Sequence, residues 1–486
     1  MANNPVREKL SHPVIDADGH WAELYPVFFD YIREVSGNAV LEKFRSSYSR
    51  RVAPWYEASA KDRNAGRMPR PPYWGVPTSA DRMAGLIPKL YRSNLDKWGI
   101  DVSVLYPTVG LGLLTLRDLA LQSAVIRAYN VMASDLFRSH SDRIIPVGVV
   151  ALNDPQEAIA QLEHAHALGL RQVVTAGSIT RTMEADAAWQ PDPAKRRIYI
   201  DGLGLDSPYD YEPVWNKFEE LKITVTPHGG SMGWSDRNSP TNFVANHLGH
   251  FAQSHHLFAR SLVLGGVTQR HPNLIFGFLE GGIGWACNLY SDLKEHWEKR
   301  NRGFMDANLK PTNFDRKTFR AELEKWAVEE RRVADNIDDI LEKNLYQLDC
   351  DVSVETLTER DKSSDDFDRV QIGSKAELRS LFSKNFFFGC EADDPMTSIA
   401  FNPKMRLNLK PVLGSDISHF DVVDASEVLG EAYELVEHEL INEDNFRDFV
   451  YANAVKMFAG MNQDFFKGTI LENDVKRELG GAKGRN

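Results

Sequence analysis

Short apolar segments alternate with amphipathic helical patterns along most of this chain. The apolar segments are mainly continuous, as is typical of parallel strands buried on both faces, and do not alternate with polar residues. They predict eight strands, at Pro13–Asp16, Asp101–Pro107, Ile144–Leu152, Gln172–Thr175, Ile223–Thr226, Leu274–Leu279, Asn385–Phe388 and Pro411–Leu413. Between two of them, Asp154 and Pro155 open an amphipathic helix that Gly169 closes, because an Asp cap and a first-turn proline favour a helix start.

Polar and Gly-rich residues follow most of these strands, as DGH, HGG, EGG, CEADD and GSD. In a (β/α)₈ barrel the carboxyl ends of all strands meet at one face, whereas in a doubly wound sheet they spread along an edge. The convergence of so many metal-capable ends favours the barrel. We therefore predict an α/β fold, a (β/α)₈ TIM barrel with helical insertions.

The 486 residues exceed the roughly 250 that a bare barrel needs. We predict one barrel domain over residues 1–486, interrupted by two segments that do not fit the alternation. Residues 36–95 are rich in Arg, Pro, Tyr and Trp and are interpreted as an insertion or cap. Residues 290–383 are charged and helical in pattern, and we interpret them as a lid or a contact between subunits, which suggests a homodimer or higher homo-oligomer.

Charge and cysteine content narrow the functional classes. A net charge of −12 argues against nucleic acid and against anionic membrane surfaces, since both require a basic face. The three cysteines, Cys287, Cys350 and Cys390, form no CxxC pair, and their odd number is a poor disulfide framework. With no signal peptide and no apolar span in the sequence, we expect a cytoplasmic enzyme with a small-molecule substrate.

The candidate chemistry begins in the segment Asp16-Ala-Asp18-Gly-His20. Residues two apart on a strand point to the same side, so Asp18 and His20 can reach one ion, and we expect Asp16 to be structural. A polar turn after the strand explains the same residues, because Asp and Gly are turn formers.

Three more strand ends carry potential ligands. His228 precedes Gly229 and Gly230, Glu280 ends a continuous apolar strand, and Asp416 lies in the segment GSDISH. Each has an ordinary alternative, namely a satisfied polar histidine or a helix cap. Together with Asp18 and His20 they form a set in which Asp416 could also act as a general base.

Imidazole and carboxylate ligands suit Zn, Mn or Fe. Three carboxylates with two imidazoles offset more than one divalent charge. The set therefore favours the harder ions Mn²⁺ and Fe²⁺ over Zn²⁺, or two ions in place of one.

These motifs make the chain resemble the amidohydrolase superfamily, in the branch that includes aminocarboxymuconate semialdehyde decarboxylase and the resorcylate decarboxylases. The resemblance covers most of the chain outside the two insertions and includes the closing segment Asn453–Phe466. It implies that Asp18 takes the place of the first His of the family's HxH motif and His20 that of the second. It also implies His228 as the ligand after strand five, Asp416 as the Asp after strand eight, and Glu280 at the position of the strand-six His.

Two departures from the family pattern matter. Asp18 and Glu280 are carboxylates where many relatives have His, although decarboxylase relatives with a carboxylate at the first position are known. The fourth strand end, Val173–Gly177, has no lysine, so the carbamylated bridging lysine of the binuclear hydrolases is missing. A second metal would have to use Glu280 with side chains such as His256, Glu391 or His419.

Four functions remain open on the sequence. The first is a metal-dependent hydrolase that cleaves a C–N, ester or thioester bond with metal-activated water, using Asp416 and His256 as catalytic residues. The second is a non-oxidative decarboxylase of a small aromatic acid, in which Asp416 protonates the ring carbon. The third is a dinuclear iron-dependent oxygenase, and the fourth is a non-enzymatic partner subunit. The sequence favours the hydrolase narrowly and predicts one or two divalent ions per chain.

Overall fold

The computed structural model describes residues 4–48, 52–72, 78–183, 198–229, 238–310, 313–343 and 366–482. The chain divides into two compact units. Unit 1 comprises Met1–Leu289 and Arg379–Asn486, and unit 2 comprises Tyr290–Leu378. All of the predicted site residues lie in unit 1, so the fold of that unit determines the geometry of the site.

Unit 1 is built around an eight-stranded parallel sheet whose strands follow one another in chain order. The strands are β1 (Ile15–Trp21), β2 (Val102–Pro107), β3 (Ile144–Val149), β4 (Gln172–Thr175), β7 (Val225–Pro227), β8 (Phe276–Phe278), β9 (Phe386–Cys390) and β10 (Pro411–Leu413). Their residues are almost all buried, which is the reason for their continuous apolar sequences. The predicted strands and the TIM barrel are thus confirmed.

The first and last strands approach each other just beyond the end of β10. There the backbone N–H of Asp416 donates to Asp18 O at 3.2 Å, and that of His20 donates to Ile417 O at 3.1 Å. These two bonds bring the carboxyl ends of β1 and β10 together and nearly close the barrel. The loop that follows β10 is thereby attached to the strand that carries Asp18 and His20.

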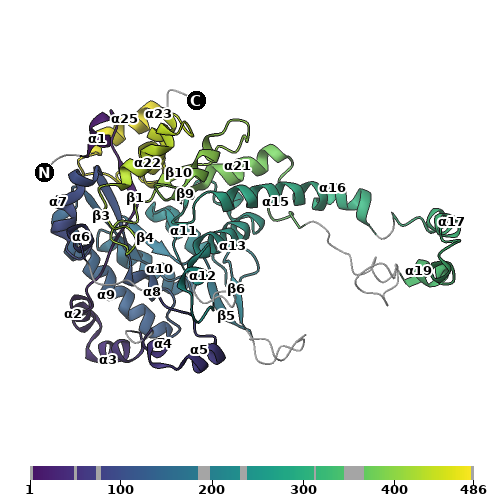
Figure 1. The fold of residues 1–486 in the computed structure, drawn as a ribbon, viewed down its shortest axis with the longest axis horizontal. Coiled ribbons are helices and arrows are strands. Elements are labelled where there is room, and N and C mark those ends of the chain that lie inside the picture. The colour runs from purple at the N-terminus through teal and green to yellow at the C-terminus, as the bar shows by residue number, and fades with distance from the viewer. Residues whose placement is uncertain are drawn as a thin grey trace. The chain divides into compact units, whose positions relative to one another are not determined.

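Helices surround the strands of unit 1 (Figure 1). The main ones are α2 (Tyr25–Ser36), α3 (Asn38–Ser47), α7 (Pro88–Trp98), α9 (Leu119–Phe137), α10 (Pro155–Ala167), α11 (Glu212–Leu221), α13 (His250–Leu264), α22 (Val428–Glu437), α24 (Asn453–Ala459) and α25 (Glu472–Ala482). The start of α10 is the predicted one, because the Asp154 side chain accepts hydrogen bonds from the backbone N–H groups of Gln156 and Glu157. In the described part of the chain, no helix combines the length and apolar character needed to cross a membrane.

The chain between β4 and Asp210 contains a second, smaller sheet that the sequence analysis does not predict. It is an antiparallel pair, β5 (Ile179–Thr182) and β6 (Ile198–Asp201). The ion pair between Arg181 Nε and Asp201 Oδ2, 2.5 Å long, joins the two strands. Four-residue strands separated by a long polar stretch carry too little periodicity to be distinguished from loop.

The first predicted insertion contributes short helices to unit 1, among them α4 (Ala53–Glu57) and α5 (Ala60–Gly66). Trp55 Nε1 donates to Pro240 O at 3.0 Å, which attaches this segment to the chain that follows β7. Unit 2 is helical over its described residues, with α17 (Arg316–Trp326) and α19 (Ile337–Lys343). Their roles as a cap, a lid or a subunit contact remain predictions.

Candidate metal centre

β1 brings Asp18 and His20 to the carboxyl end of the barrel through an irregular register. Asp16 pairs with Ser103, but the next paired residue is Gly19, opposite Leu105, so the strand carries one extra residue between them. A Cβ at position 19 would lie 2.2 Å from Asp16 Oδ2 and 2.6 Å from Ser103 Oγ. The motif therefore requires glycine at this position.

Asp16 joins three elements. Its carboxylate accepts hydrogen bonds from Ser103 Oγ on β2 at 2.8 Å, and from Ser415 Oγ at 2.9 Å and Ser415 N at 3.1 Å beyond β10. Burial raises the pKa of Asp16 to about 7, and these hydrogen bonds oppose the rise. Its role is structural, because it ties the loop that carries Asp416 to β1.

His20 and His228 face each other across the barrel mouth. His20 Nδ1–H donates to Pro107 O at 3.0 Å, which leaves its Nε2 unprotonated and directed at His228 Nε2, 3.2 Å away. Both Nε2 atoms lie 3.5 Å from Asp18 Oδ1. Two imidazole nitrogens and a carboxylate oxygen directed at one point are the arrangement of a metal-ligand set.

Glu280 and Asp416 complete the group from the ends of β8 and β10. Glu280 Oε2 lies 3.4 Å from His228 Nε2, and Asp416 Oδ1 lies 3.6 Å from His20 Nε2. Both residues have left-handed backbones, with φ of 55° and 51°. Such conformations cost about 1–3 kcal/mol in non-glycine residues and are concentrated at functional sites.

Two buried carboxylate oxygens test whether an ion fits here. Asp18 Oδ1 and Glu280 Oε2 are both inaccessible to solvent, and neither accepts a hydrogen bond from the described residues. A buried carboxylate without a donor is costly unless a cation balances it. The ligand atoms of Asp18, His20 and His228 form one compact group, and those of His20, Glu280, Asp416 and His419 form another. A divalent metal fits this donor set.

Burial shifts the pKa of every member of the site. It raises the pKa of Asp18 and Glu280 well above their usual range, with Asp416 adding to the shift of Glu280. It lowers the pKa of His20 well below the usual value and that of His228 to about 3, and the neighbouring His419 adds to both shifts. Neutral imidazoles are the form that binds metal, so the histidines are poised as ligands.

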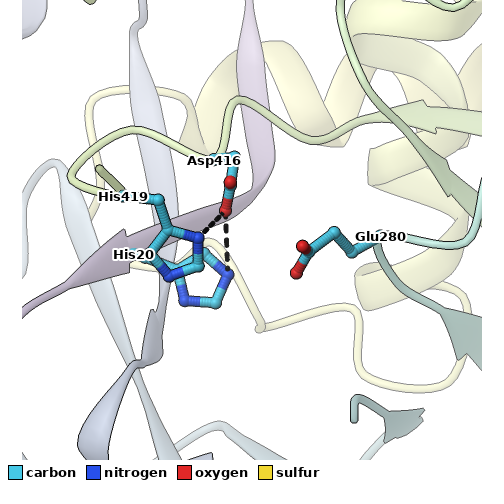
Figure 2. A group of neighbouring side chains, drawn as sticks. All are labelled: His20, Glu280, Asp416 and His419. Atoms are coloured by element: carbon cyan, nitrogen blue, oxygen red, sulfur yellow. Dashed lines mark ion pairs between the residues drawn. The ribbon is translucent and has the colours of Figure 1, made fainter. Parts of the chain in front are cut away.

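His419 belongs to this site, although sequence reasoning named it only as an optional ligand for a second ion. Its Nδ1 forms an ion pair with Asp416 Oδ1, and its ring lies 4.0 Å from the ring of His20 (Figure 2). Burial lowers the pKa of His419, but the adjoining Asp416 carboxylate outweighs it and the net pKa shift is upward. Figure 2 also shows Glu280 reaching toward the other three side chains from a separate element. The spacing Asp416-x-x-His419 is the sequence signal that could have placed His419 in the site.

The histidine pair on α13 is divided between two environments. His255 is fully buried, and its Nε2–H donates to Leu279 O at 2.5 Å, next to Glu280. His256, the residue we selected as catalytic, is half-buried and belongs to neither group of candidate ligands found among the described residues. Its catalytic role stays a prediction, whereas the structure gives His255 a contact at the site.

Comparison with known proteins identifies the family. A family model described as amidohydrolase matches residues 15–331, which include β1, β7 and β8 with Asp18, His20, His228 and Glu280. The chain belongs to the amidohydrolase family. This membership makes it a metal-dependent enzyme of the hydrolase and decarboxylase group, as the resemblance implied. A search of curated proteins gave no match.

Several solved structures are similar to this chain at low sequence identity. An amidohydrolase from Mycobacterium avium subsp. paratuberculosis K-10 is 18% identical, with a TM-score of 0.51 over 92% of this chain and 100% of that one. A 2,6-dihydroxybenzoate decarboxylase in complex with 2,6-dihydroxybenzoate is 13% identical, with a TM-score of 0.48 over 92% and 99%. A dihydroxybenzoic acid decarboxylase from Polaromonas sp. JS666, with bound manganese and 2-nitroresorcinol, is 13% identical, with a TM-score of 0.48 over 92% and 97%. At 18% identity and a TM-score of 0.51, the first of these likenesses concerns the fold alone.

Proposed function

We propose that this amidohydrolase-family member is a divalent-metal-dependent, non-oxidative decarboxylase of a small organic acid. The observation that carries the proposal is the carboxylate-x-His pattern on β1. Asp18 lies 3.5 Å from both imidazole Nε2 atoms, so it is a ligand candidate and not only a turn residue. Decarboxylase relatives with a carboxylate at this position are known. The absence of a lysine from Val173–Gly177 argues in the same direction, against a lysine-bridged binuclear hydrolase.

Asp18, His20, His228 and Asp416 would hold the ion, with Glu280 beside them. When bound, the ion polarises an oxygen of the substrate and balances the buried carboxylates. The bond between the substrate carbon and its carboxylate breaks, and the carboxylate leaves as carbon dioxide. The electron pair stays on the substrate carbon, and the Asp416 carboxyl supplies a proton to that carbon. His419 adjoins Asp416 and is in position to return the proton.

Hydrolysis, which the sequence favoured, is the second candidate, and one observation supports it. Among the described residues, no lysine or arginine forms an ion pair with Asp18, Glu280 or Asp416. A neutral amide, ester or thioester enters such an anionic site more readily than a carboxylate does. In this reaction Asp416 would take a proton from the attacking water.

Two product assays distinguish these reactions. Purified, metal-loaded protein is incubated with aromatic acids that carry a hydroxyl beside the carboxylate, and carbon dioxide is measured. A parallel set of amides, esters and thioesters is followed by release of the acid. Carbon dioxide release that disappears in Asp416→Asn supports the decarboxylase. Turnover of the second set alone would replace it with the hydrolase, and turnover of neither set would count against both.

Elemental analysis of protein purified without added metal tests the ion itself. About one ion per chain fits the site formed by Asp18, His20, His228 and Asp416. About two ions, with iron among them, would make Glu280 and His419 ligands and bring the oxygenase forward. Absence of metal from a folded protein that also binds none on titration would remove the mechanism.

A further inference from the structure

A buried carboxylate outside the ligand groups lies close to the candidate metal centre. Glu23 is 6% exposed and follows the end of β1 by two residues. Its Oε2 accepts hydrogen bonds from Thr108 N at 3.2 Å and Val109 N at 2.7 Å, and its Oε1 accepts one from Gly110 N at 3.0 Å. One carboxylate thus binds three consecutive backbone N–H groups.

The stretch that Glu23 binds also contacts two histidines of the site. It begins at Pro107, the last residue of β2, whose carbonyl oxygen accepts the Nδ1–H of His20 at 3.0 Å. The next residue, Thr108, has its Oγ1 3.3 Å from Nε2 of His419. The turn Pro107–Gly110 therefore donates hydrogen bonds to Glu23 through its backbone N–H groups. The same turn contacts the two histidines through the Pro107 carbonyl oxygen and the Thr108 hydroxyl.

We propose that Glu23 is a positioning residue of the metal centre: by holding the turn Pro107–Gly110, it orients His20 Nε2 toward the ion and fixes His419 against Thr108. The proposal rests on the metal centre of the proposed function. The partner of the non-ligating nitrogen sets the tautomer and ring orientation of a metal-binding histidine. Here that partner is a backbone carbonyl in a turn, so whatever fixes the turn also fixes the ligand.

The physical cost of this arrangement supports a role beyond packing. A buried carboxylate is unfavourable unless donors saturate it, and here three N–H groups do so at distances from 2.7 to 3.2 Å. Burial raises the pKa of Glu23 to about 6 in spite of these bonds. A purely structural carboxylate would only cap the short helix α8 (Val109–Leu113), and its loss would lower stability without changing the ion's affinity or its ligand geometry.

The test compares Glu23→Gln with a matched variant. An amide presents an NH₂ group where one of the carboxylate oxygens accepted a hydrogen bond, so the turn loses part of its anchor. The matched control is Asp154→Ala, which removes the N-terminal cap of α10, a helix that supplies no ligand. Both variants are purified metal-free. They are titrated with Mn²⁺ and Zn²⁺ against a fluorescent chelator, and the absorption spectrum of the Co²⁺ form is recorded.

We expect Glu23→Gln to bind the ions at least tenfold more weakly and to change the Co²⁺ spectrum, since partners of metal ligands are typically worth 10- to 100-fold in affinity. Asp154→Ala should keep the wild-type metal affinity and the wild-type Co²⁺ spectrum. A folded Glu23→Gln variant with wild-type affinity and spectrum would overturn the proposal. If that variant does not fold, Glu23→Asp is tested in its place, because it keeps the charge but reaches less far. It should weaken metal binding and change the Co²⁺ spectrum in the same way but to a smaller extent. Wild-type affinity and spectrum in Glu23→Asp would overturn the proposal equally.

Failure of this inference and failure of the proposed function are distinguishable. Metal affinity and the Co²⁺ spectrum do not depend on which reaction the enzyme performs. A wild-type protein that binds no divalent ion would overturn the metal centre, and this inference with it. A wild-type protein that binds an ion while Glu23→Gln binds it equally would overturn the role of Glu23 alone.

Discussion

Replacing Glu280 by Gln removes one of the three carboxylates at the barrel mouth and preserves the volume of the side chain. The ligand atoms of Glu280 and Asp416 lie within 4.8 Å of each other. Two unit charges at that separation repel by about 3.5 kcal/mol at an effective dielectric constant of 20. Without a metal, this repulsion destabilises the fold. With a metal bound, both carboxylates are instead attracted to the ion.

We therefore expect Glu280→Gln to have opposite effects in the two states. At pH 7.5 the metal-free variant should be more stable than wild type by about 1–3 kcal/mol. The gain stays below the full repulsion, because the raised pKa of Glu280 and the adjacent His419 already relieve part of it. The variant should also bind metal at least tenfold more weakly, which is about 1.4 kcal/mol or more.

Urea unfolding of the metal-free proteins measures the first effect, and competition with a chelator measures the second. Glu391→Gln is the control, since Glu391 follows the next strand, β9, but belongs to neither ligand group among the described residues. It should change stability and affinity less than Glu280→Gln does. A Glu280→Gln variant that is less stable without metal and binds metal normally would refute the reasoning that an ion balances these charges.

Four further predictions follow from the same geometry. Asp416→Asn should abolish turnover and still bind metal, because it removes the proton-transferring carboxyl but keeps an oxygen donor; turnover at the wild-type rate would remove the assigned role. His228→Ala should lower metal content by elemental analysis, and full retention would count against the site. Gly19→Ala should cost about 3 kcal/mol or more in urea unfolding, since its Cβ would lie 2.2 Å from Asp16 Oδ2; a loss under 1 kcal/mol would contradict this. Burial lowers the pKa of His255 to about 3, so the stability that comes from its neutral ring is present above pH 6.5 and is lost as pH falls towards 3. Any destabilisation by His255→Gln should accordingly shrink by about 2 kcal/mol between pH 7.5 and pH 5. A stability difference between wild type and variant that is the same at both pH values would refute the lowered pKa of His255.

The sequence by itself determined the strands of the barrel and their order. Strands buried between a barrel interior and a layer of helices need apolar residues on both sides, so they form continuous apolar segments that can be found one at a time. The residues just after these strands are polar because they line the open face. For this reason Asp18, His20, His228, Glu280 and Asp416 could be selected from strand ends before any contact was known.

Only the tertiary structure decided which side chains meet. The extra residue in β1 that places Gly19 against Asp16 depends on the register with β2, which local sequence does not specify. The choice between His255 and His256 depends on the rotation of α13 against β8, and adjacent helical residues are equally compatible with the apolar pattern around them.

Two further contacts of the site join residues that are far apart in the chain. Glu23 meets the turn Pro107–Gly110 across 85–87 residues of chain, and His419 meets Thr108 across 311. Neither pairing has a local signal, because each arises only when separate strand ends converge at the mouth of the barrel. The sequence thus determined which residues can do chemistry, and the closure of the barrel decided which of them act on one another.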